Sequence, residues 1–130
     1  MRNILLLVLF ALSAAILSGC GQTKVTGKVT FSDGSPLTSG TVIFENDQHS
    51  YTATIKGDGT FNMGMLKDGE GIPPGAYRVA VMAIDPASEN EGTPRLLTHA
   101  KYASSRTSEL TYDIQKSTSV TITVEKPAGQ

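Results

Sequence analysis

The 130-residue sequence contains a single cysteine and no tryptophan, and neither sign of charge dominates it. One cysteine excludes a disulfide framework within the chain. The formal net charge is −1 and no basic stripe is present, so nucleic acid is not an expected partner. The sequence also lacks a Lys/Arg cluster of the kind that holds a protein on an anionic membrane surface. Helical periodicity is absent beyond the first segment, which argues against a helical domain.

The longest apolar run lies at the N-terminus. Residues 4–17 are apolar except for Ser13, and Arg2 supplies a positive charge just before them. The run has the length of the apolar region of a signal peptide and is short of the ~20 residues that a membrane-spanning helix needs. We therefore expect residues 1–19 to be a helical signal peptide.

The residues that end this segment, Leu17, Ser18, Gly19 and Cys20, resemble the bacterial lipobox. The resemblance implies cleavage just before Cys20. It also implies a diacylglycerol on the Cys20 thiol and a further acyl chain, such as palmitate, on the new amino group. Two or three acyl chains anchor a protein stably, whereas one holds it only marginally. The alternatives are an uncleaved membrane anchor and an ordinary secretory signal cut elsewhere.

This interpretation places the protein in the cell envelope, attached to a membrane through its N-terminal lipid. Residues 20–23 would form the lipidated end and a short tether. Gly21 stands where many lipoproteins of the inner membrane carry an aspartate, which favours the outer membrane.

From residue 24 onward, apolar residues alternate with polar ones in the two-residue period of half-buried strands. Seven such segments, separated by turn-rich stretches, predict an all-β protein with a seven-stranded β-sandwich. We expect this domain to span residues 24–126, with a tail at 127–130. The expected strands cover residues 24–31, 40–45, 50–55, 60–63, 75–84, 109–115 and 119–125.

Two Asp-Gly pairs, at residues 33–34 and 58–59, predict turns, because Gly tolerates the positive φ that tight turns require. Gly27 within the first strand indicates either close packing or a bulge. Tyr77 begins the longest strand on its apolar face. We expect its ring to be buried and its hydroxyl to cap a loop.

The sequence offers no set of residues typical of an active site. His49 and His99 are the only histidines and lie far apart in the sequence, so we expect neither a metal site nor another cofactor. Glu89 and Glu91 share one loop, where carboxylates usually face water and are not opposed across a cleft. No phosphate-binding or dinucleotide-binding motif occurs. We therefore expect a protein that is not an enzyme.

The longest stretch without a pattern covers residues 85–99, and loops of this length are either functional or mobile. We take it, with the segment that follows, as the candidate binding site for an envelope protein or a glycan. Tyr102 is the one aromatic residue expected outside the strands and is the candidate platform for a sugar ring. The candidate binding residues are Pro86, Glu89, Glu91, Arg95, His99 and Tyr102.

Several of these segments together resemble carboxypeptidase-regulatory-like domains, which belong to the transthyretin-like group. The matching segments are residues 25–31, 33–37, 40–44, 58–61 and 74–79, and residues 101–103 with 107–111 resemble a variant common in small lipoproteins of planctomycete-type bacteria. The resemblance implies a Greek-key, prealbumin-like sandwich. It implies no catalytic residues, because this domain accompanies catalytic domains or stands alone. The expected function is a non-catalytic, membrane-tethered interaction module, and the alternative is a small-ligand or glycan-binding module.

Overall fold

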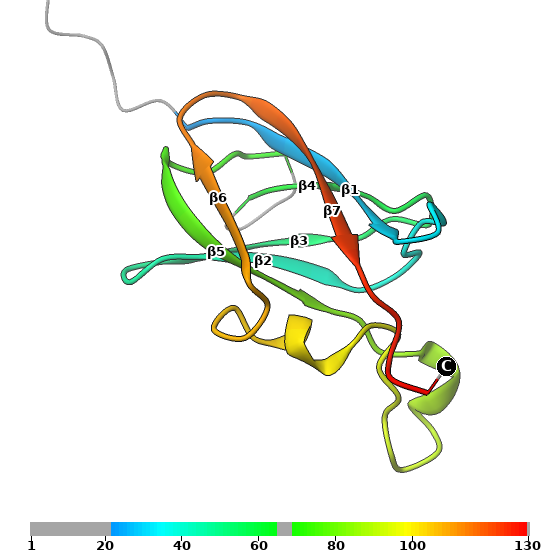
Figure 1. Cartoon of the computed structure of the whole chain (residues 1–130). Coiled ribbons are helices and arrows are strands. Elements are labelled where there is room, and N and C mark those ends of the chain that lie inside the picture. The colour runs from blue at the N-terminus through cyan, green and yellow to red at the C-terminus, as the bar shows by residue number, and fades with distance from the viewer. Residues whose placement is uncertain (1–21, 65–68, 130) are drawn as a thin grey trace, which may run out of the picture.

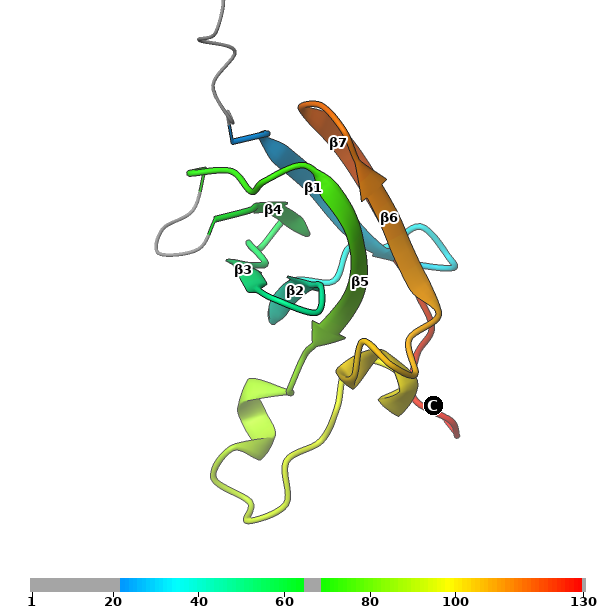
Figure 2. The ribbon, with the colours of Figure 1, turned by 90° about the vertical axis from the view of Figure 1, so that its left-hand side faces the viewer.

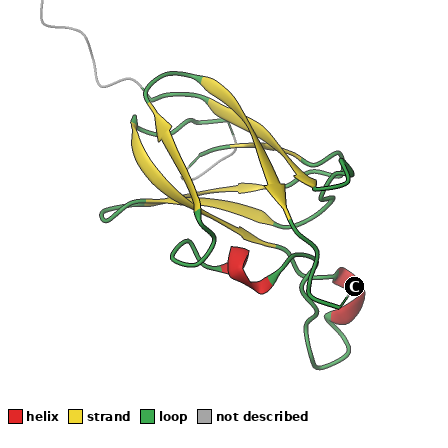
Figure 3. Ribbon diagram, viewed as in Figure 1, coloured by secondary structure: helices red, strands yellow, loops and turns green. Residues whose placement is uncertain are grey.

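Two β-sheets make up most of the protein (Figures 1 and 3). The computed structural model describes residues 22–64 and 69–129. The predicted signal peptide, the lipobox and Cys20 lie outside the described residues. One sheet has the order β4 (Thr60–Asn62), β1 (Val25–Phe31), β7 (Thr118–Val124). The other has the order β3 (Ser50–Thr54), β2 (Thr41–Glu45), β5 (Gly75–Met82), β6 (Leu110–Ile114).

The all-β prediction is confirmed. Each expected strand segment overlaps a strand whose ends differ from the expected ends by no more than two residues. The alternation also holds. In β1, Val25 and Val29 are fully buried, whereas Thr26 and Lys28 are exposed. The helical content of the described residues is limited to two short 3-10 helices, η1 (Pro86–Ser88) and η2 (Ala100–Ala103).

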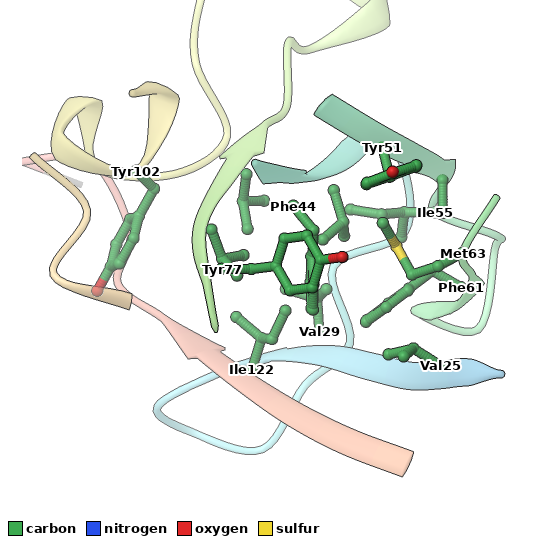
Figure 4. Packing of buried hydrophobic residues seen from close by; sticks show 14 of the residues in the cluster. Val25, Val29, Phe44, Tyr51, Ile55, Phe61, Met63, Tyr77, Tyr102 and Ile122 are labelled. Carbon is green, nitrogen blue, oxygen red and sulfur yellow. The ribbon is translucent and has the colours of Figure 1, made fainter. Parts of the chain in front are cut away.

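Aliphatic side chains and a group of aromatic rings fill the space between the two sheets (Figure 4). Phe44 is fully buried, and its ring centroid lies 6.4 Å from Phe61, 6.0 Å from Tyr77 and 5.9 Å from Tyr112. Burying a side chain of this size contributes about 2–3 kcal/mol. The rings come from strands of both sheets, so their packing joins the sheets into one core.

Gly27 in β1 packs directly against the Phe61 ring. A Cβ at this position would lie 2.5 Å from Cζ of Phe61 and 2.5 Å from the carbonyl oxygen of Val120. The prediction of close packing is therefore confirmed, and no bulge is needed to explain the glycine.

The first and last strands lie side by side and run parallel. Their register extends from Val25 opposite Thr118 to Phe31 opposite Val124. The other named strand pairs within the described residues are antiparallel. Because β1 and β7 start at the same end, the turn that leads into β7 lies beside the start of β1 (Figure 1).

The chain is fixed to the domain from Thr23 onward. Thr23 is 8% exposed, and its backbone N–H donates to the carbonyl of Ile72 at 2.7 Å while the Ile72 N–H donates back at 2.8 Å. The Thr23 hydroxyl donates to the same carbonyl at 2.6 Å. On its other side, the N–H of Lys24 donates to the hydroxyl of Ser117 at 3.0 Å. Thr23, expected in the tether, is thus part of the folded body.

Candidate functional site

The loop that follows β5 projects from the end of the protein opposite the start of β1 (Figures 1 and 2). Its base is closed by an antiparallel bridge between Ile84 and Leu96. Asp85 and Arg95 add two contacts. The Asp85 N–H donates to the Arg95 carbonyl at 2.8 Å, and Nη2 of Arg95 lies 2.9 Å from Oδ2 of Asp85. The loop therefore leaves and re-enters the domain at one closed neck.

Inside the loop, η1 is held by polar side chains that accept and donate locally. The Asp85 carboxylate accepts from the N–H of Ala87 at 3.0 Å and so caps η1. Ser88 is fully buried, and its hydroxyl donates to the Asp85 carbonyl at 2.7 Å while accepting from the Arg95 N–H at 2.9 Å. These hydrogen bonds give the loop a defined conformation.

The charges of the loop face outward. Nη1 of Arg95 lies 3.3 Å from Glu91, so this guanidinium contacts two carboxylates while remaining half-exposed. The Asp85 carboxylate accepts a hydrogen bond from the Arg95 guanidinium and another from the Ala87 N–H. These bonds, that from Arg95 first, hold the pKa of Asp85 below its usual value. Glu89 is exposed, as is Pro86 at the start of η1. Residues 85–95 carry three carboxylates against one guanidinium, so the loop presents a net negative surface.

His99 and Tyr102 do not join the outer loop; they organise the chain after it. The His99 N–H donates to the Glu125 carbonyl at 2.8 Å, and its Nδ1 accepts from the Lys101 N–H at 3.2 Å, which caps η2. Tyr102 is only 5% exposed and belongs to the buried hydrophobic cluster. The prediction that Tyr102 forms an exposed platform is therefore wrong.

The reason for this burial is that η2 packs on the outer face of the larger sheet, against β5. Figure 4 shows Tyr102, a residue of η2, apart from the rings that lie between the sheets. Two serines that follow η2 hold the chain against the larger sheet. The Ser105 hydroxyl donates to Glu45, and the Ser108 hydroxyl donates to the Val79 carbonyl.

A groove with a volume of about 320 Å³ lies between residues 95–100 and the C-terminal tail. It is lined by Arg95, Leu96, Thr98, His99, Ala100, Pro127 and Ala128. Of the predicted binding residues, it brings together Arg95 and His99. Across the described ranges, no group of three or more His, Cys, Asp or Glu side chains is placed to hold a metal ion. His49 lies in the turn between β2 and β3, where its ring is near Tyr51.

Two residues that organise the site, Asp85 and Ser88, were missed by the sequence reasoning. An Asp directly before a Pro is a frequent start of a helical turn, with the carboxylate as cap and the proline at the first helical position. The run Asp85-Pro86-Ala87-Ser88 carries that signal.

No protein-family model matches the chain, and no curated protein matches it. Among solved structures, a 9R-lipoxygenase from Cyanothece PCC8801 is similar at a TM-score of 0.37 and 15% identity. That similarity covers 95% of this chain and 20% of the lipoxygenase chain, so the protein spans a fifth of the lipoxygenase's length. At this TM-score, the similarity assigns neither fold nor activity. Within residues 22–64 and 69–129, no helix is long and apolar enough to cross a membrane.

Proposed function

We propose that this chain is a lipoprotein of the cell envelope, anchored in the outer membrane through acyl chains on Cys20. The lipobox-like residues Leu17, Ser18 and Gly19 support this proposal, as does the apolar segment before them. The fixing of Thr23 to Ile72 is compatible with it, because the folded body starts just after the proposed cleavage point.

We further propose that the two sheets form a Greek-key sandwich of the carboxypeptidase-regulatory-like, transthyretin-like type. The structural roles of the motif residues support this assignment. The Tyr77 hydroxyl donates to the Pro73 carbonyl at 2.5 Å, as expected of a loop cap. Asp58 accepts from the Thr60 N–H at 3.0 Å in a turn where Gly59 has a φ of 85°.

The domain acts, in this proposal, as a non-catalytic module that binds another envelope component through the loop at residues 85–99. The observation that carries it is the closed neck formed by Asp85 and Arg95. A loop with a fixed conformation loses little conformational entropy when it binds, so it can serve as a recognition surface. Lipid anchoring adds to this, because it raises the local concentration of the loop near membrane partners.

A loop replacement tests the binding role. Asp85 and Arg95 are paired, so residues 86–94 can be exchanged for Asn-Gly, a two-residue turn that joins antiparallel strands. We expect the variant to unfold cooperatively, to stay in the membrane fraction and to lose specific crosslinks to its envelope partner. The matched control exchanges the turn at Asp47 and Gln48 for Asn-Gly and should keep the crosslinks. Retention of every crosslink in the 86–94 variant would overturn the binding role.

A second candidate function is the binding of a small ligand or glycan, which the groove between residues 95–100 and the C-terminal tail favours. Its volume falls at the lower end of the range for small-molecule sites. A glycan array separates the two functions. A sugar that binds the wild type but not a His99→Ala variant would favour the glycan module.

A further inference from the structure

The end of the protein at which the chain enters the fold is formed by three segments that lie together. We call it the N-terminal pole and define it as residues 23–24, 69–75 and 115–117. Thr23 pairs with Ile72, and Lys24 is linked to the last segment, because its N–H donates to Ser117 and its carbonyl accepts from the Thr118 N–H at 2.9 Å. Figure 1 shows β1 beginning at this end, near the turn between β6 and β7.

We propose that the N-terminal pole rests on the headgroup layer of the bilayer that holds the lipid, so that the domain stands end-on with a fixed orientation. This inference rests on the proposed acylation of Cys20. Thr23 is immobilised by three hydrogen bonds to Ile72, so only Gly21 and Gln22 can act as a tether. Three Cα–Cα steps reach at most about 11 Å.

The acylated cysteine must lie at the boundary between hydrocarbon and headgroups, and the headgroup layer on one side of a bilayer is about 5–8 Å thick. A tether with a reach of about 11 Å therefore leaves almost no gap between this layer and the pole. A freely tumbling domain would need a much longer tether. The short tether keeps the N-terminal pole next to the headgroup layer.

The distribution of charge agrees with this orientation. The pole exposes Lys24 and, in the turn before β7, Lys116, against one exposed carboxylate, that of Glu70, so its net charge is +1. The far end carries the acidic loop at residues 85–95. It begins after the eight residues of β5, which rise about 23 Å from the pole. The same orientation thus turns the candidate binding loop away from the membrane.

Site-specific fluorescence tests the orientation in the full-length, acylated protein. Gln115→Cys places a thiol at the pole and Asn90→Cys places one in the loop; both positions are exposed. Cys20 is the sole native cysteine, and acylation blocks its thiol, so each variant offers one site for a dye. The probe is a vesicle of phosphatidylcholine and phosphatidylglycerol that contains a lipid spin-labelled at its headgroup.

We expect strong quenching of the dye at position 115 and little at position 90. Insertion of eight Gly/Ser residues between Gly21 and Gln22 should sharply reduce the quenching at 115, because the longer tether frees the pole. Equal quenching at both positions in protein that carries the acyl mass would overturn the orientation alone. A protein without acyl mass, measured on the same samples before labelling, would instead overturn the proposed lipidation.

Discussion

Asp85 and Arg95 contact each other twice, through a backbone hydrogen bond of 2.8 Å and a side-chain ion pair of 2.9 Å. The two contacts differ in kind. The backbone bond closes the neck of the loop whatever the side chain is, whereas the ion pair fixes the carboxylate that caps η1. Substitution of the arginine separates these contributions, because it leaves the backbone bond possible.

Arg95→Ala should loosen the loop without unfolding the domain. We expect faster hydrogen exchange at the amides of Asp85 and Ala87 and an upward move of the Asp85 pKa, because Arg95 is the largest cause of its lowering. Protection of the Val81 amide in β5 against hydrogen exchange should not change. NMR measures the exchange rates and the Asp85 pKa. Arg106→Ala, which removes an exposed arginine without an ion pair in the described part of the chain, is the control. Unchanged exchange at Asp85 in the Arg95 variant would show that the ion pair does not order the loop.

Gly27→Ala should destabilise the domain by about 3 kcal/mol, because its Cβ would collide with the Phe61 ring and with a carbonyl oxygen that cannot move freely. Gly57→Ala is the matched control, since a Cβ there meets nothing within 4 Å. We expect this substitution to be neutral or to stabilise the domain by about 0.5 kcal/mol, because alanine reduces the conformational entropy of the unfolded chain. Urea denaturation measures both. Equal midpoints for the two variants would contradict the packing described at Gly27.

Tyr77→Phe should cost about 1 kcal/mol, the usual net value of one hydrogen bond. The ring stays in the core, while the Pro73 carbonyl loses its donor. Burial raises the pKa of the Tyr77 hydroxyl, which keeps it protonated and able to donate. Thermal unfolding checks the loss. A Phe variant as stable as the wild type would mean that the hydroxyl does not cap this loop.

Asp58→Asn should make stability less sensitive to acid. The hydroxyl of Thr60 and then its N–H hold the pKa of Asp58 below its usual value. The ionised Asp58 carboxylate therefore stabilises the fold fully above its unfolded-state pKa of about 3.9. This stabilisation is lost as the pH falls through the lower folded-state pKa. We expect a shallower decline of the denaturation midpoint below about pH 4 in the variant. Glu89→Gln, an exposed control, should follow the wild type; identical curves for the Asp58 variant and wild type would refute the prediction.

The alternation of apolar residues was sufficient to predict the strands, because burial of one face gives each strand its own two-residue signature. The parallel pairing of β1 with β7 was not predictable in the same way. Val25 and Thr118 are opposite each other in the sheet, and nothing in either sequence segment indicates which strand it pairs with. The same holds for Thr23, whose attachment to Ile72 depends on where the loop before β5 returns.

The loop that carries the candidate site was predictable from the sequence, but the contacts within it were not. Tyr102 was expected to be exposed because no strand pattern surrounds it, yet the outer face of β5 buries it. Its buried neighbours Thr98 and Ser105 are polar, so no apolar period in the sequence marked this segment as buried.

The most direct test of the central proposal compares the native protein with a Cys20→Ala variant by intact mass and membrane fractionation. We expect the native protein in the membrane fraction, as a chain that begins at Cys20 and carries added acyl mass. The variant should lose both the added mass and the membrane attachment. An unmodified native chain that still begins at Met1 would contradict the proposal, because its first segment would then have been neither cleaved nor acylated.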